Sequence, residues 1–245
     1  MDELTCAACD RFDSILQEHS LTKWAIVSLA TASPESLAAL VRVNSGMRKS
    51  QEVTTITAEQ WIEKAQNIAG SEKFNQLRSN LLIALCSSLE YAVKAFFVDS
   101  VNNRPGGQID WSGIAEMLNQ RPDDYADLDW KFAVADRLFD SRPKKQLLMA
   151  DRFLDFVTSK CAVAQNKIFD QTKIHKHMLN QAYSTRNSVI HCGGYLNRGR
   201  LKSEHPVVTQ VVSLDAQLLH GYVVALDEFM KALRNVSEKI SLQHL

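Results

Sequence analysis

The sequence predicts an all-α protein, and three observations support that prediction. The chain of 245 residues contains only nine Gly and five Pro, so most turns must lie between long regular elements. From Leu77 to Phe97, apolar residues recur in steps of four, the spacing of one helix face. From Leu219 to Ile240, apolar residues alternate steps of three and four. This second stripe predicts a core helix of a bundle, and an exposed dimer seam is the alternative.

The first seventy residues predict an N-terminal helical region. Thr57 and Gln60 resemble a capping box that opens a helix. Pro34 is suited to a first helical turn. The helices expected there are Asp2–His19, Leu21–Ala32, one that begins at Ser33-Pro34, and Thr57–Ile68. We therefore expect a helical region at residues 1–70 and a helical bundle domain at residues 71–245.

The second region opens with the most regular helix pattern in the chain. It begins at Ser71 and should end near Asn102, where Asn, Arg, Pro and Gly residues form a loop signal. Beyond it we expect helices at Ser112–Asn119, Asp124–Phe139, Lys144–Ser159 and Asn166–His191, a short extended stretch at Val207–Val212, and the closing helix.

The longest apolar run, Leu81 to Val98, predicts a buried helix rather than a membrane span. Glu90 and Lys94 lie near its middle, where charges would be costly in a bilayer. The acidic start Met1-Asp2-Glu3-Leu4 does not resemble a secretory leader. We therefore expect a cytoplasmic protein with no membrane partner.

Charge is balanced over the whole chain but not along it. Lys plus Arg number 28, as do Asp plus Glu. Between Gln165 and His205, seven basic residues face only Asp170 and Glu204, whereas Gln108 to Asp140 is mainly acidic. This asymmetry predicts a surface that binds a polyanion such as RNA, and two ordinary solvated faces are the alternative. The cations expected to contact RNA are Lys173, Lys176, Arg198 and Arg200.

The sequence offers no recognisable metal or cofactor motif. Cys6 and Cys9 have the spacing of a redox or zinc pair, but no second ligand pair follows, which favours free cysteines on a helix face. His175 and His177 are two residues apart, so on a helix they would point to nearly opposite sides. We therefore expect chemistry without a metal and without a cofactor.

The most informative segment lies at a predicted helix end and contains Arg186, Asn187 and His191. Asn187 and His191 are i, i+4 neighbours, so the amide can orient the imidazole. Arg186 offers a planar cation for a phosphate, and an imidazole beside it suits RNA cleavage by the 2′-hydroxyl. However, Arg186 and His191 are separated by about 140° around a helix. An alternative interpretation is a surface ion pair at Arg186 and a helix cap at His191.

The Arg-Asn-x-x-x-His pattern resembles the signature of the HEPN superfamily. Its continuation, His191-Cys192-Gly193-Gly194 followed by Asn197, is similar to the form in the RiboL-PSP-like and Apea-like branches. The earlier apolar helix with Glu90 and, four residues later, Lys94 resembles the family's other recurrent helix.

This resemblance implies an antiparallel helical bundle that forms a homodimer, with two motifs facing each other across the interface. It implies a metal-independent endoribonuclease of phage defence, toxin–antitoxin or stress systems, whose products end in a 2′,3′-cyclic phosphate and a 5′-hydroxyl. Arg186 would hold the scissile phosphate, Asn187 would support the site and His191 would act as general acid/base. Glu90 would orient Arg186, or would instead pair with Lys94.

The resemblance leaves two functional classes open. A catalytically idle module that binds RNA, nucleotide or a partner protein is the alternative to the enzyme, and the intact Arg/Asn/His set favours the enzyme. An antitoxin or activator protein is an expected partner. Family toxins regulated by nucleotidyl transfer have a Tyr two residues after the His, whereas this chain has Gly193 there and its next Tyr is Tyr195.

Overall fold

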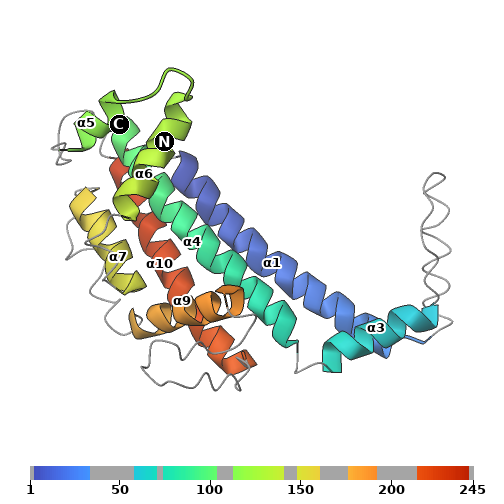
Figure 1. Ribbon diagram of the computed structural model, residues 1–245. Coiled ribbons are helices and arrows are strands. Elements are labelled where there is room, and N and C mark those ends of the chain that lie inside the picture. Colours follow the sequence, from blue (N-terminus) through green and yellow to red (C-terminus); the bar gives the residue numbers. More distant parts are fainter. Residues whose placement is uncertain are drawn as a thin grey trace, which may run out of the picture.

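The fold is a helical bundle, which confirms the all-α prediction. The computed structural model describes residues 3–33, 58–70, 74–103, 113–140, 148–160, 176–191 and 214–242. These residues form helices and turns, and none of them lies in a strand. Three long helices, α1, α4 and α10, make up the body of the bundle, and shorter helices pack around it (Figure 1). The extended stretch expected at Val207–Val212 and the helix start expected at Ser33-Pro34 lie largely or wholly outside the described residues.

Helix α1 spans Glu3–Thr31 without interruption, so the expected break between His19 and Leu21 is wrong. The hydroxyl groups of Ser20 and Thr22 donate hydrogen bonds to the carbonyl oxygens of Leu16 and Glu18, at 3.0 and 2.7 Å. These polar side chains are satisfied inside the helix, so they do not end it. Helix α3, Ala58–Gly70, packs against α1 and agrees closely with the helix expected from the capping pattern.

Helix α4, Asn75–Asn103, lies between α1 and α10 and contacts most of the other helices. It begins four residues later than expected, because Phe74 has a φ of 68°. This left-handed backbone conformation is unfavourable for a bulky residue and cannot continue a right-handed helix backwards. Thr5 near the start of α1 contacts Asp99 near the end of α4, so these two helices run antiparallel.

The next helices are α5 (Ile114–Asn119), α6 (Asp127–Phe139) and α7 (Met149–Asp155). Helix α6 begins three residues later than expected, because a turn in which the backbone N–H of Tyr125 donates to the carbonyl of Pro122 precedes it. Helix α7 passes directly into a π-helix, η3, at Phe156–Lys160.

Two further helices complete the described fold. Helix α9 spans Lys176–His191 and packs on α4, α7 and α10. Its expected beginning near Asn166 lies outside the described residues. Helix α10, Ala216–Leu242, buries Leu219, Tyr222, Leu226, Phe229 and Leu233 of its apolar stripe, which confirms a core helix rather than an exposed seam.

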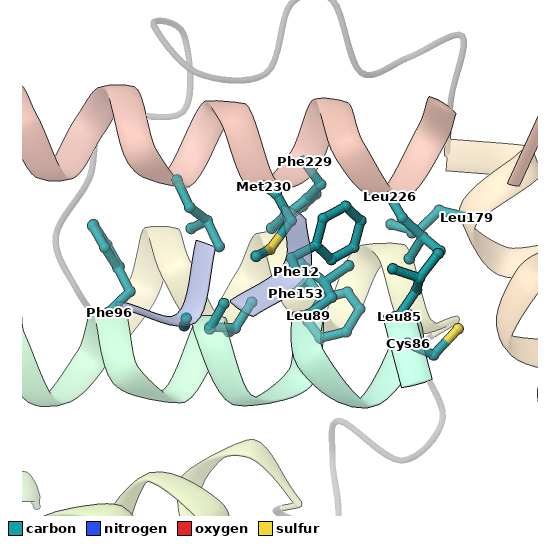
Figure 2. Packing of buried hydrophobic residues seen from close by; sticks show 14 of the residues in the cluster. Phe12, Leu85, Cys86, Leu89, Phe96, Phe153, Leu179, Leu226, Phe229 and Met230 are labelled. Atoms are coloured by element: carbon teal, nitrogen blue, oxygen red, sulfur yellow. The ribbon is translucent and has the colours of Figure 1, made fainter. Parts of the chain in front are cut away.

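One apolar core joins the three long helices. Figure 2 shows Phe12 of α1 and Phe153 of α7 between the side chains of α4 and α10. Phe153 also stacks edge-on against Tyr183 of α9, with ring centroids 5.3 Å apart. The start of α1 therefore belongs to the same core as the helices of residues 71–245.

Helix α4 is also long and apolar enough, by length and composition, to cross a membrane. However, 61% of that stretch is buried within the bundle, as in the core helix of a soluble protein. This feature is therefore weak evidence for a membrane span.

Candidate functional site

The last turns of α9 present the Arg-Asn pair of the motif. The buried Tyr183 anchors this part of the helix, since its hydroxyl donates to the carbonyl oxygen of Cys86 on α4 at 2.8 Å. On the other side, the hydroxyl groups of Thr185 and Tyr222 of α10 lie 3.1 Å apart. Arg186 follows directly, so its backbone is fixed against two neighbouring helices.

Arg186 lies beside Glu90 of α4. One terminal nitrogen of Arg186, Nη2, is 4.0 Å from Oε1 of Glu90, and the two side chains are 21% and 23% exposed. The other terminal nitrogen, Nη1, donates to Oδ1 of Asn187 at 3.0 Å. The Nε of Arg186 is buried and has no hydrogen-bond partner among the described residues. The guanidinium is thus held in place without all of its donors being used.

Of the two alternatives for Glu90, the geometry favours the ion pair with Arg186. Lys94 instead forms a salt bridge with Asp136 of α6, and its ammonium lies 5.7 Å from the centre of the Phe139 ring. Burial raises the pKa of Glu90, while the positive charges of Arg186 and Lys94 oppose that rise. Burial is the larger effect, so the pKa of Glu90 in the folded protein lies above its ordinary value.

Arg152 of α7 is a second cation near this site, and the sequence analysis did not single it out. Its Nη2 donates to Oδ1 of Asp140 at 2.6 Å and to the carbonyl of Phe139 at 2.8 Å. Its Nε is also buried without a partner in the described part of the chain. The charge of Arg152 lowers the pKa of Glu90, so this arginine contributes to the field around the Glu90–Arg186 pair. No sequence motif marks Arg152, because its partners lie at the end of another helix, α6.

The remaining motif residues are only partly described. Asn187 is exposed beside Arg186, so its amide nitrogen is accessible. His191 is the last residue of α9, and its side chain lies outside the described part of the structure.

Of the four cations expected to bind RNA, the structure describes only Lys176. Lys176 lies at the opposite end of α9, about 15 Å along the helix, and its ammonium pairs with Asp151 at 2.5 Å. Lys173, Arg198 and Arg200 lie outside the described residues. The structure thus brings Glu90, Arg186 and Asn187 together but does not bring Lys176 to them.

Cysteines and metal ligands form no second site in the described ranges. Cys6, Cys9 and Cys86 form no disulfide bond with one another, and the first two lie on one helix, α1, as expected. Burial raises the pKa of Cys9 to about 11 and also raises that of Cys86, so both are inert as nucleophiles at neutral pH. No three His, Cys, Asp or Glu side chains cluster as metal ligands within residues 3–33, 58–70, 74–103, 113–140, 148–160, 176–191 and 214–242.

Comparison of this chain with models of protein families, with curated proteins and with solved structures found no match. The resemblance to HEPN proteins therefore depends on the motif residues and the order of the helices.

Proposed function

We propose that this chain is a metal-independent endoribonuclease of the HEPN type. The observation that best supports the proposal is the position of Arg186, which α9 holds beside Glu90, with Asn187 exposed next to it. His191 follows four residues after Asn187 on the same helix. A fixed cation, an amide and an imidazole near one helix end are the groups that metal-free RNA cleavage requires.

Each group has a distinct role in the proposed reaction. Arg186 binds the non-bridging oxygens of the scissile phosphate, since Glu90 at 4.0 Å compensates its charge only in part. The Oδ1 of Asn187 already accepts a hydrogen bond from Arg186, so its NH₂ group is left to donate to His191 or to the phosphate. An imidazole removes the proton of the 2′-hydroxyl, the 2′-oxygen attacks phosphorus, and the departing 5′-oxygen takes up a proton. The products are a 2′,3′-cyclic phosphate and a 5′-hydroxyl.

The proposed active form is a homodimer. Within one helix, Arg186 and His191 are separated by about 140°, which makes it difficult for both to contact one phosphate. A two-fold axis beside the end of α9 would bring a second copy of the motif to the opposite side of the RNA. The composite cleft would then have one arginine and one imidazole on each side of the phosphate.

The proposal is tested with single-stranded RNA in the presence of EDTA. Arg186→Ala and His191→Ala should each lower the cleavage rate by about 10²–10⁴-fold, because each removes a group that acts in the transition state. Arg11→Ala and His177→Ala are matched controls, since both residues are exposed and lie away from the motif. Full activity of His191→Ala, or products that end in 5′-phosphate, would refute the mechanism.

A catalytically idle module that binds RNA or a partner protein is the second candidate. The observation that favours it is the limited exposure of Arg186, 21%, together with its contacts to Glu90 and Asn187, which also suit a structural ion pair. This function predicts that the wild type binds RNA without cleaving it, and that Arg186→Ala weakens this binding. Cleavage of any RNA by the wild type that both motif variants abolish would exclude the idle module.

The proposed setting is phage defence, a toxin–antitoxin pair or a stress response, with an antitoxin or activator protein as partner. Expression of the wild type should then slow cell growth, whereas Arg186→Ala and His191→Ala should be harmless. Equal toxicity of wild type and both variants would contradict this setting.

A further inference from the structure

A second polar site lies nearer the start of α4 than Glu90 does, in a cleft between α1, α4 and α10. The cleft has a volume of about 240 Å³. Its floor is apolar and includes Leu16 of α1, Leu77 of α4 and Leu219 of α10. Ligand pockets for drug-sized molecules usually have roughly 300–1,000 Å³, so this cleft suits a smaller molecule.

The charged side chains along this cleft are all basic or potentially so. They are His19 and Lys23 of α1, Arg78 of α4 and His220 of α10, and no acidic side chain of the described residues lines the cleft. Three separate helices supply these four groups, so their convergence results from the packing of the bundle. A concave surface with one sign of charge concentrates counter-ions of the opposite sign.

Arg78 is held rigidly in this wall. Its side chain is largely buried, and Nη1 donates to the carbonyl oxygen of Leu214 at 3.0 Å. The backbone N–H of Leu214 in turn donates to Oδ1 of Asn75 at 2.8 Å. No salt bridge links Arg78 to a carboxylate in the described part of the chain, so its positive charge is not neutralised there.

Two further features make the cleft attractive to an anion. The first turn of α4 contributes to its lining through Leu77, and the amino end of a helix has partial positive charge, whereas the carboxylate of Asp215 already accepts a hydrogen bond from the first turn of α10. The pKa of His19 is lowered by burial and then by the charges of Lys23 and Arg78. After burial, the charges of Lys23 and Arg78 are therefore the effects that act on this imidazole.

We infer that this cleft binds a small phosphate monoester, with the phosphate between Lys23, Arg78 and the two histidines and an apolar body on the leucine floor. A phosphate is favoured over a single carboxylate because a dianion matches several cations. The apolar floor is not expected to contribute to the binding of a bare inorganic ion.

This inference does not depend on the proposed ribonuclease activity. Leu81 lines the cleft and Glu90 lies beside Arg186, so the two sites are about 14 Å apart along α4. Loss of one site should leave the other intact.

Phenyl phosphate is a suitable probe because it combines a dianion with a small apolar body. The imidazole signals of His19 and His220 would be followed by NMR during titration of the wild-type protein, with inorganic phosphate and phenol as matched partial ligands. We expect saturable shifts with phenyl phosphate at millimolar concentration or below, weaker binding of inorganic phosphate, and no effect of phenol. The pKa of His19 should rise in the complex, because a bound anion stabilises the imidazolium.

A charge variant tests the assignment of the cleft. Lys23→Gln should weaken phenyl phosphate binding by about two- to fivefold, the effect of an exposed cation on a partner charge. Lys64→Gln is the matched control, since Lys64 is exposed on α3 and does not line the cleft. Absence of saturable shifts at the two histidines would overturn the inference, as would equal affinity for inorganic phosphate or an unchanged affinity of Lys23→Gln.

Discussion

Replacing Asp99 with Ala tests how firmly the first helix is joined to the bundle. Asp99 lies in α4, is 5% exposed, and accepts two hydrogen bonds on Oδ2 from the fully buried Thr5. The donors are the backbone N–H, at 2.8 Å, and the hydroxyl, at 2.6 Å. Because Thr5 lies in the first turn of α1, its N–H has no partner within the helix, and the carboxylate faces the positive end of the helix dipole.

The expected loss of stability follows from these two bonds. A hydrogen bond to a charged group contributes about 1.5–3 kcal/mol, so removal of both sets an upper limit of about 6 kcal/mol. The cost of burying the carboxylate offsets part of this. We therefore expect Asp99→Ala to lower the free energy of unfolding by about 3–4 kcal/mol, or the melting temperature by roughly 6–16 °C for a chain of this size. Asp99→Asn keeps an acceptor oxygen and should lose about half as much.

Urea unfolding followed by far-UV circular dichroism measures this difference. Asp124→Ala is the control, since Asp124 is exposed in the turn that precedes α6. A value for Asp99→Ala within about 0.5 kcal/mol of the wild type, the range of ordinary surface changes, would refute the reasoning. So would a greater loss in Asp99→Asn than in Asp99→Ala.

Three further predictions concern α4, α9 and α10. Tyr183→Phe removes the hydroxyl that donates to α4, so urea unfolding should show a loss of about 1 kcal/mol, and no loss would show that this bond does not anchor α9. In Gly221→Ala the new Cβ would lie 2.5 Å from the flexible end of Met178, which can move. Since Ala exceeds Gly in helix propensity by about 1 kcal/mol, thermal unfolding of this variant should show unchanged or slightly higher stability. A clear loss of stability would mean that the end of Met178 cannot move away from the new Cβ. Burial raises the pKa of Glu90, so the folded state binds a proton on this carboxyl group more tightly than the unfolded state does. The free energy of unfolding should therefore fall as the pH rises from 4.5, the ordinary pKa of this group, through the pKa in the folded state. Glu90→Gln should flatten this dependence in urea unfolding at a series of pH values, and exposed Glu63→Gln should not; equal slopes in both variants would contradict the effect of burial.

The sequence predicted α4 and α10 well because each buries the regular apolar residues that marked it. Helix α10 shows this most clearly, since residues spaced by three and four positions are buried from Leu219 to Leu233. Local polar residues misled the prediction at Ser20, whose hydroxyl bonds within α1 instead of ending it. The π-helix after Asp155 was also missed, because apolar periodicity is judged against 3.6 residues per turn and does not reveal a wider turn.

The candidate sites were predictable to different extents. The Arg-Asn pair was visible because its residues are adjacent, and Glu90 was found through its place in a recurrent helix pattern. The cleft that contains Lys23, Arg78 and His220 was not foreseen, because each cation belongs to a different helix. Only the packing of the helices brings such residues together, so no residue spacing within one segment of the chain could have predicted this cleft.

The contact between α1 and α10 has a consequence for how the protein is made. Arg234 of α10 donates to Asp10 and Asp13 of α1, each at 3.1 Å, and the thiol of Cys9 lies 3.8 Å from the carbonyl oxygen of Met230. These partners are more than 200 residues apart in the chain. During translation, the apolar faces of α1 and α4 must therefore wait for α10 to leave the ribosome before the core can close. A nascent chain of this protein is thus expected to depend on chaperones until α10 is synthesised.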